Sequence, residues 1–153
     1  MEKVKILWVD DEIELLKPHI LFLERKGYVL ATANNGEDAL DMIDNEVYDI
    51  IFLDENMPGI SGLETLSLIY ENHNIPVVMI TKSEEEYIME EALGSKISDY
   101  LIKPVNPHQI LLSLKKNLDT KRLVNEKVTS NYQKEFREIR MTLLDVRSLK
   151  DWV

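Results

Sequence analysis

The charged residues of this chain constrain its fold most strongly, because they lie directly after short apolar runs. Three such runs end at charged residues: Ile6–Val9 at Asp10 and Asp11, Ile50–Leu53 at Asp54, and Tyr100–Ile102 at Lys103. Short runs that are apolar throughout are typical of strands buried on both faces of a parallel sheet. The carboxyl ends of parallel strands lie at one edge of an open sheet, where ligands bind. The sequence therefore predicts that these charged side chains share one pocket.

The chemistry of such a pocket follows from its charges. Carboxylates held close together repel one another, and at least one would stay protonated unless a cation were bound. Mg²⁺ prefers oxygen ligands and often binds phosphate as well. The residues therefore indicate a magnesium-assisted phosphoryl site, with Asp10, Asp11 and Asp54 holding the metal. Asp54 would attack phosphorus to form an aspartyl phosphate, and Lys103 would contact a phosphoryl oxygen.

Taken one at a time, these residues have simpler interpretations. Asp54 and the pair Asp10-Asp11 could cap turns or helices, and Lys103 could be an ordinary surface lysine. The combination favours the metal site, because neighbouring acids at facing strand ends are costly without a cation.

Other residues near the predicted pocket are less informative. Thr81 ends the apolar run 77–80, where its hydroxyl could donate to a phosphoryl oxygen or cap the next helix. Tyr100 alone would be interpreted as a core residue. The three histidines match no metal-ligand spacing and are interpreted as structural or solvent-exposed: His19, His73 and His108.

Strand and helix signals alternate over the first 118 residues. Strands are predicted at 4–9, 29–33, 50–54, 77–80 and 99–102. Helical spacing extends from Ile13 to Leu23, Ala39 to Ile43, Leu63 to Ile69, Glu84 to Leu93 and Ile110 to Leu118. Gly27 and Gly94 are predicted helix stops, and the second helix is predicted to begin near Gly36. Ser61 with Glu64 matches a capping box. This alternation predicts an α/β, flavodoxin-like, doubly wound fold with a five-stranded parallel sheet in the order 2-1-3-4-5.

Residues 119–153 carry no strand signal and are predicted to be a helical extension of a domain at 1–118. Apolar residues recur at intervals of three and four from Val128 to Val153. This predicts an amphipathic helix of roughly five or six turns, with Ser130 and Gln133 as its capping box. Such a helix must bury its apolar stripe on the body, on a second copy, or on a domain beyond the chain.

Composition excludes several classes of site. The net charge is −10, and residues 1–118 contain 10 Lys or Arg against 22 Asp or Glu. This argues against nucleic-acid binding, which needs a basic face. The chain has no cysteine, which excludes disulfides, thiolate metal sites and a cysteine nucleophile. Without a signal-peptide core or an apolar run near the ~18 residues of a membrane helix, the protein is expected to be cytoplasmic.

Together, the site residues resemble the receiver domain of two-component response regulators over residues 1–118. The match consists of Asp10-Asp11, the string Asp54-Glu55-Asn56-Met57-Pro58, Gly62, Thr81, Tyr100 and Lys103-Pro104. The resemblance implies that Asp54 accepts a phosphoryl group from a histidine kinase. It also implies Mg²⁺ held by Asp11, Asp54, the backbone carbonyl of Asn56 and, through water, Asp10.

The resemblance further implies a switch rather than an enzyme, with at most slow self-phosphorylation and self-dephosphorylation. Thr81 and Tyr100 would be the switch pair, and Lys103 would contact the phosphoryl group. The surface of the fourth helix, fifth strand and fifth helix would change, and it often supports a dimer in this family. One residue departs from the pattern: Lys82 replaces a usually small residue, so it could hinder phosphodonor access or supply a second cation.

Within this family, the strings at 6–12, 16–20 and 84–92 look like those of PorX-type regulators. Regulators of that type are associated with gliding motility and type IX secretion, and they carry a PglZ-like effector after a helical segment. The likeness implies that residues 119–153 begin this segment and that the effector lies beyond the chain.

Three other functions each require a feature that can be compared with this sequence. A hydrolase of the haloacid-dehalogenase type needs an aspartate two residues after its nucleophile, where this chain has Asn56. A flavin or nucleotide module needs a glycine cluster after the first strand, which the chain lacks. A DNA-binding regulator needs a winged-helix or helix-turn-helix segment, and none follows residue 118. A stand-alone phosphorelay receiver remains an alternative.

Overall fold

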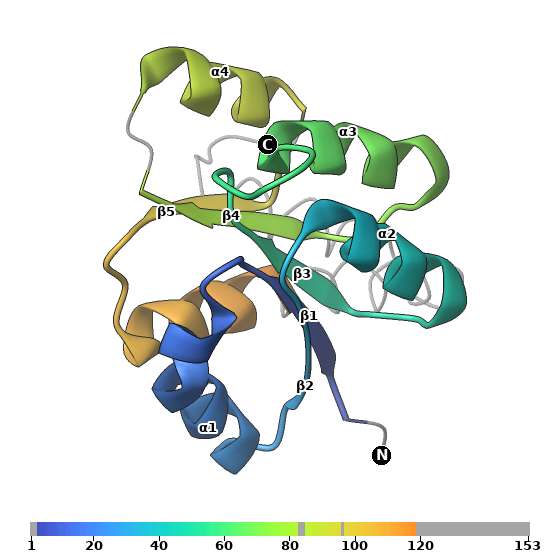
Figure 1. Ribbon diagram of the computed structural model, residues 1–153. Helices are drawn as coiled ribbons and strands as arrows, with labels where there is room; N and C mark the ends of the chain where they lie inside the picture. Colours follow the sequence, from blue (N-terminus) through green and yellow to red (C-terminus); the bar gives the residue numbers. More distant parts are fainter. Residues whose placement is uncertain (1–2, 83–84, 96, 119–153) are drawn as a thin grey trace, which may run out of the picture. The chain divides into compact units, whose positions relative to one another are not determined.

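The computed structural model describes residues 3–82, 85–95 and 97–118, and within them a parallel sheet lies between two helical layers (Figure 1). The strands are β1 (Lys5–Val9), β2 (Val29–Ala33), β3 (Ile50–Leu53), β4 (Val77–Thr81) and β5 (Asp99–Ile102). They are all parallel and have the order β2-β1-β3-β4-β5. The predicted flavodoxin-like topology is therefore confirmed.

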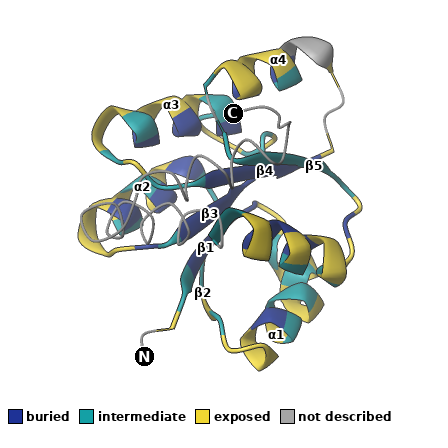
Figure 2. Cartoon of the chain, turned by 180° about the vertical axis from the view of Figure 1, so that it is seen from behind, coloured by how far each residue is buried: buried dark blue, intermediate teal, exposed yellow. Residues whose placement is uncertain are grey.

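The helices divide between the two faces of the sheet, as Figures 1 and 2 show from opposite sides. The helix α1 (Lys17–Arg25) and the helix over residues 107–118 cover one face. The other face is covered by α2 (Gly36–Asn45), α3 (Gly62–Asn72) and α4 (Glu86–Gly94). This arrangement leaves the two ends of the sheet uncovered by these helices, and the predicted site residues lie at the carboxyl end.

The central strands explain why the apolar runs do not alternate. Every residue of β3 and β4 is buried, and so is β1 from Ile6 to Val9, whereas the edge strands β2 and β5 are partly exposed. The dark blue centre of the sheet in Figure 2 shows this burial. Trp8 and Phe52 pack edge to face between β1 and β3, with ring centroids 4.9 Å apart. Their burial anchors the two strands that end at Asp10 and Asp54.

The helix starts agree with the sequence signals in two places. Ser61 and Glu64 form the predicted capping box of α3, each side chain accepting a hydrogen bond from the other's backbone N–H. α2 begins at Gly36, as expected, and its cap is Asn35, whose side chain accepts from the backbone N–H of Asp38 at 2.8 Å. The Asn35 cap was not predicted.

The first predicted helix is not continuous. Ile13–Leu16 form a 3-10 helix, η1, and the α-helix begins only at Lys17. The reason is Pro18, which occupies the first turn of α1. Proline has no N–H to give to the preceding turn, so an α-helix running through it would lose a hydrogen bond. Gly27, with a φ of 100°, follows the end of α1 as the sequence predicts.

The fourth helix also differs from its prediction. α4 begins at Glu86, after an N-cap at Glu85, and Gly94 is its last residue rather than a stop behind it. Thr81 is the last residue of β4, so the interpretation of Thr81 as the cap of this helix is wrong.

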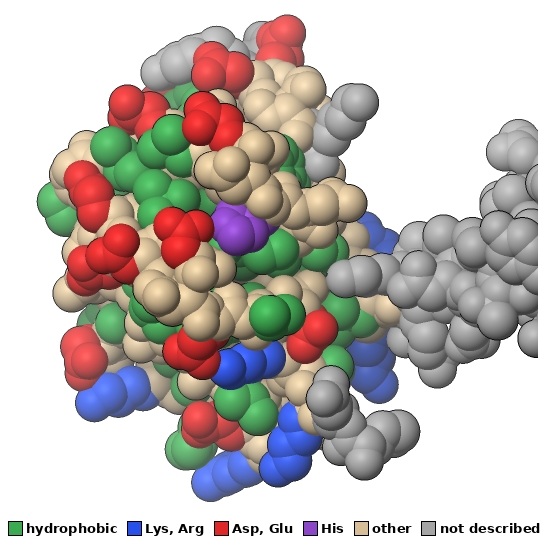
Figure 3. All heavy atoms as spheres, turned by 90° about the vertical axis from the view of Figure 1, so that its right-hand side faces the viewer, with side chains coloured by type: hydrophobic (Ala, Val, Ile, Leu, Met, Phe, Trp, Pro, Cys, Tyr) green, Lys and Arg blue, Asp and Glu red, His purple; other side chains and the backbone are tan. Residues whose placement is uncertain are grey.

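Residues Met1–Asn117 form one compact unit. The predicted amphipathic helix from Val128 to Val153, with its cap at Ser130 and Gln133, lies outside the described residues. Within the described part of the chain, no helix is both long and apolar enough to cross a membrane. On the face shown in Figure 3, Asp and Glu side chains are spread widely, while Lys and Arg side chains gather toward its lower edge.

Candidate functional site

Four predicted site residues meet at the carboxyl edge of the sheet. Asp10 follows β1, Asp54 follows β3, Thr81 ends β4 and Lys103 follows β5. Backbone hydrogen bonds extend the strand pairing to these positions: the N–H of Asp54 donates to Val9, and that of Lys103 to Thr81, at 3.0 and 2.9 Å. Because this strand pairing fixes the backbone at each of these residues, their side chains lie close together although the residues are far apart in the sequence.

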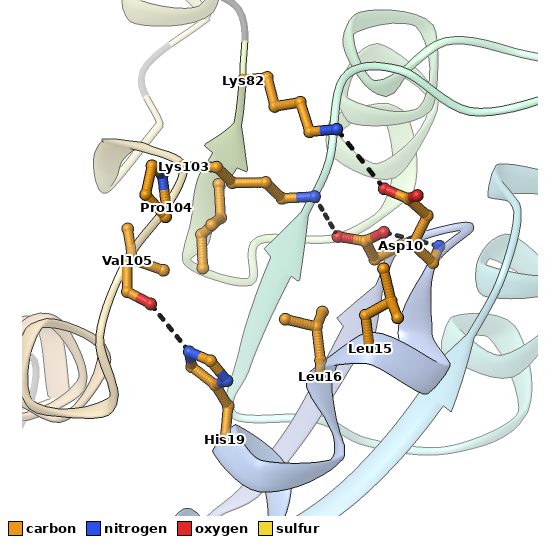
Figure 4. A pocket seen from close by; sticks show the side chains of 10 residues that line it. Asp10, Leu15, Leu16, His19, Lys82, Lys103, Pro104 and Val105 are labelled. Carbon is orange, nitrogen blue, oxygen red and sulfur yellow. Dashed lines mark hydrogen bonds and ion pairs between the residues drawn. The ribbon is translucent and has the colours of Figure 1, made fainter.

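Lys103 lies between two carboxylates. Its Nζ atom is 2.6 Å from Asp10 Oδ2 and 3.5 Å from Asp54 Oδ2. The three side chains are only 15%, 1% and 6% exposed. Figure 4 shows the Lys103 side chain reaching across to Asp10. The interpretation of Lys103 as an ordinary surface lysine is therefore wrong.

Burial leaves Asp54 poorly solvated. Burial raises the pKa of the Asp54 carboxyl, and the nearby charge of Lys103 opposes this. The charge of Asp10 raises the pKa further, while hydrogen bonds from Thr81 and the Asn56 backbone lower it, and the balance lies above the ordinary value. Asp54 does not cap α3, since Ser61 does so. Such a carboxylate gains from any additional positive charge near it.

The ammonium of Lys103 is stabilised by its partners. Burial alone lowers the pKa of Lys103, but the hydrogen bond to Asp10 and the charges of Asp54 and Asp10 outweigh burial and raise it. Lys103 therefore carries its positive charge at neutral pH and can act as a fixed cation beside Asp54.

The end of β1 carries a group of carboxylates. One oxygen each of Asp10, Asp11 and Glu12 lies within 4.8 Å of the others. Asp10 is buried, whereas Asp11 and Glu12 are exposed. Asp10 Oδ1 also accepts from the N–H of Glu12 at 2.8 Å, so it holds the turn before η1, although it is not the N-cap. This donor set is made of oxygen alone, which suits a hard cation such as Mg²⁺.

The loop after Asp54 folds back tightly on the strand end. An added Cβ at Gly62 would lie 2.2 Å from the carbonyl oxygen of Asp54, so only glycine fits there. The side chain of Glu55 accepts from the N–H of Leu63 at 2.8 Å, and burial raises the pKa of that side chain. These contacts hold the backbone at Asn56 beside Asp54. On the opposite side, the bond between Lys103 and Pro104 is cis.

Tyr100, the second predicted switch residue, is half-buried in β5 and packs against the core. It lies beside Met79 in the register of β4 and β5, two positions before the level of Thr81. Its switching role stays a prediction.

A cavity of about 390 Å³ beside Lys103 was not predicted. Its walls are largely apolar: Leu15, Leu16, Ile80, Pro104 and Val105. Asp10, Glu12, Lys82 and Lys103 also line it, and Figure 4 shows Lys82, Lys103 and Asp10 gathered at one end. Glu12 is the site residue that sequence reasoning missed, although it directly follows the acidic pair.

The histidines take no part in the acidic group. His19 Nε2 lies 2.8 Å from the carbonyl oxygen of Val105, and His73 Nε2 lies 3.0 Å from Asp44 Oδ1. His108 packs edge to face on Phe22. Among the residues that the structure describes, only one group of three or more His, Cys, Asp or Glu residues could hold a metal ion. It consists of Asp10, Asp11 and Glu12.

Comparison with known proteins gives a consistent result. A family model described as "Response regulator receiver domain" matches residues 6–115. The chain is 34% identical over 113 residues to the transcriptional regulatory protein ResD of Bacillus subtilis (strain 168), covering 74% of this chain and 47% of ResD. It is 35% identical over 113 residues to the transcriptional regulatory protein CpxR of Escherichia coli (strain K12), covering 72% of this chain and 47% of CpxR.

A solved structure agrees with these relatives. The crystal structure of a CheY-like response regulator receiver domain protein from Methanospirillum hungatei JF-1 superimposes with a TM-score of 0.75 at 27% identity. The match covers 79% of this chain and 98% of that one. The chain spans about half the length of the two curated relatives, ResD and CpxR.

Proposed function

The chain belongs to the response regulator receiver domain family, and from this membership we propose that Asp54 accepts a phosphoryl group from a histidine kinase. Receiver domains are signalling switches. The observation that carries the proposal is the position of Lys103, whose ammonium lies 2.6 Å from Asp10 and 3.5 Å from Asp54. A buried carboxylate beside a fixed cation and further acids is suited to phosphoryl transfer, which depends mainly on positioning and charge neutralisation.

In the proposed transfer, an Asp54 oxygen attacks phosphorus while the bond from phosphorus to the donor breaks, and the donor keeps the electron pair. Lys103 and Thr81 would donate to the phosphoryl oxygens. Mg²⁺ would be held by Asp11, Asp54 and the backbone carbonyl of Asn56, with Asp10 acting through water, and would neutralise negative charge at the phosphoryl group. The oxygen-only acidic group at the end of β1 supports this assignment.

Phosphorylation would act by shifting a population. The added phosphoryl group brings charge and acceptor oxygens, toward which Thr81 would move and Tyr100 would turn inward. This pair would bias the surface of α4, β5 and the helix over residues 107–118 between two packings. That surface, or the helix that the sequence predicts from Val128 to Val153, would support a homodimer. Slow self-phosphorylation and self-dephosphorylation are expected.

The output is proposed from sequence likeness. We propose that residues 1–118 are the receiver domain and that residues 119–153 lead to an effector beyond this chain. The PorX-type strings favour a PglZ-like effector and a role in type IX secretion or gliding. The greater length of ResD and CpxR agrees with a missing effector. A cytoplasmic location also stays a proposal.

The test is covalent labelling with acetyl phosphate and Mg²⁺, followed by intact mass measurement. The wild-type chain should gain one phosphoryl group, and Asp54→Asn should gain none. Asp41→Asn, which removes an exposed carboxylate of α2, is the matched control and should label normally. Undiminished labelling of Asp54→Asn would refute the assignment. Sustained turnover of a phosphomonoester would instead favour the hydrolase alternative.

A further inference from the structure

Two ion pairs lie side by side at the site and join the same parts of the sheet. The inner pair, Lys103 and Asp10, is nearly buried. The outer pair is Lys82 and Glu12, with Nζ 3.8 Å from Oε1 and side chains 70% and 48% exposed. Figure 4 shows both contacts, each reaching from the side of β4 and β5 to the end of β1. The two lysines therefore present two cations to one acidic end of the sheet.

We propose that Lys82 is a second cationic contact for the phosphoryl group on Asp54, and that Glu12 competes for Lys82 before phosphorylation. This inference rests on the proposed function. In this exchange, the Lys82 ammonium leaves Glu12 when Asp54 is phosphorylated and returns to Glu12 when the phosphoryl group is lost.

Both residues are held close to the reacting position. Lys82 directly follows Thr81, which is hydrogen-bonded to Asp54. The backbone of Glu12 is held by the hydrogen bond from its N–H to Asp10 Oδ1, and a carboxylate oxygen of Glu12 lies within 4.8 Å of one from each of Asp10 and Asp11. Lys82 and Glu12 line the same cavity as Lys103. The Lys82 ammonium therefore lies at the rim of the site, next to Glu12, whose backbone is hydrogen-bonded to Asp10.

The strengths of the alternative contacts favour an exchange. An exposed ion pair at 3.8 Å is weak, because water screens it and two side chains must be ordered. A phosphoryl group carries close to two negative charges and three acceptor oxygens, so its hydrogen bonds to an ammonium are stronger. The flexible lysine stem allows the ammonium to move between the two partners.

The exchange has a consequence for the lifetime of the phosphorylated state. In hydrolysis, a water oxygen attacks phosphorus, the bond from phosphorus to the Asp54 oxygen breaks, and Asp54 recovers its carboxylate. The proton of the water passes to the released phosphate or to solvent. Held by its contact with a phosphoryl oxygen, the Lys82 side chain would occupy space that the attacking water needs, and without its charge it would lose this contact and leave that space open. Removing its charge should therefore speed hydrolysis, and removing its competitor should slow it.

The experiment measures how fast the labelled chain loses its phosphoryl group. The 153-residue chain is labelled with acetyl phosphate and Mg²⁺, the donor is removed, and phosphoprotein is followed by intact mass. Lys82→Met, which keeps the length without the charge, should lose the group several-fold faster. Lys82→Arg should lie within about twofold of the wild type. Glu12→Gln should lose the group at least about twofold more slowly, because Lys82 no longer has a charged alternative.

Lys17→Met and Glu14→Gln are the matched controls. Lys17 and Glu14 form another exposed ion pair, at 2.9 Å, and neither lines the cavity. They change the net charge in the same way and should leave the rate unchanged. The Lys82 and Glu12 variants should unfold at the wild-type temperature, which excludes a general loss of structure.

Three results would overturn the inference alone, with the wild type labelled normally. The first is a rate of phosphoryl loss in Lys82→Met equal to that of the wild type. The second is a change of this rate in the same direction in Lys82→Met and Glu12→Gln. The third is an effect of Lys17→Met on this rate as large as that of Lys82→Met. The second result would mean that the pair only braces the rim. An unlabelled wild type would instead overturn the proposed function on which the inference rests.

Discussion

Lys103 Nζ lies 2.6 Å from Asp10 Oδ2, although the two residues are 93 positions apart in the chain. They follow β5 and β1, which β3 and β4 separate in the sheet. The lysine side chain therefore reaches across the carboxyl edge, and its Nζ atom also lies 3.5 Å from Asp54 Oδ2. Asp10 and Asp54 therefore share one cation, Lys103, which follows β5.

Lys103→Met should destabilise the fold. The buried Asp10 carboxylate would lose its cation while keeping its acidic neighbours, and breaking a fully buried pair costs about 3–5 kcal/mol. The site is open to solvent on one side, so we expect a loss of about 2 kcal/mol in the free energy of unfolding. Urea denaturation with EDTA measures it. Lys82→Met, at the exposed rim, should change this free energy by less than about 0.5 kcal/mol. Equal effects of the two substitutions would contradict the assigned importance of the inner pair.

Asp54→Asn should stabilise the fold at neutral pH. The pKa of Asp54 is raised in the folded state, so between the unfolded and folded values the folded chain binds more protons than the unfolded chain. Stability from this group is therefore lost as pH rises through that window, and the ionised carboxylate is a net cost at pH 7. Asparagine removes that cost, for a gain on the order of 1 kcal/mol. The gain should shrink as pH falls below the raised pKa, which thermal unfolding at several pH values would test.

The sheet was predictable because its signal is local and redundant. Each central strand contains an uninterrupted apolar run; β3 and β4 are buried throughout, and β1 is buried from Ile6 to Val9. The capping box of Ser61 and Glu64 was equally readable, since all its atoms lie within four residues. Topology then placed the charged residues that follow the strands at one edge.

The remaining details depend on contacts that no local pattern encodes. The break at Leu16 follows from Pro18, but the periodicity of Ile13, Leu16 and Ile20 hides it. The pairing of Lys82 with Glu12 joins two ordinary surface charges, 70 positions apart, that become informative only when β1 and the end of β4 are placed together. Distances between side chains at strand ends require the structure.

Gly62→Ala should disturb the proposed phosphorylation site through the backbone. The added Cβ would lie 2.2 Å from the Asp54 carbonyl oxygen and 2.6 Å from Glu55 Cα, and neither backbone atom can move without shifting the end of β3. We expect a loss of about 2 kcal/mol or more in the free energy of unfolding and slower labelling of Asp54. Gly94→Ala is the control, because nothing lies within 4 Å of its added Cβ. Equal free energies of unfolding and equal labelling rates in Gly62→Ala and Gly94→Ala would show that the contact between Gly62 and the Asp54 backbone does not constrain the residue at position 62.

Mg²⁺ should raise the stability of the chain, and EDTA should reverse the effect. The clustered oxygens of Asp10, Asp11 and Glu12 repel one another without a cation, so a metal that binds only the folded site stabilises it. At a concentration of 100 times Kd, the free energy of unfolding should rise by about 2.7 kcal/mol. Asp11→Asn should remove most of this gain while changing the stability in EDTA little, because Asp11 is exposed. Glu14→Gln, an exposed acid outside the group, should keep the full gain. Urea unfolding curves that are the same with Mg²⁺ and with EDTA would show that Asp10 and Asp11 do not hold Mg²⁺.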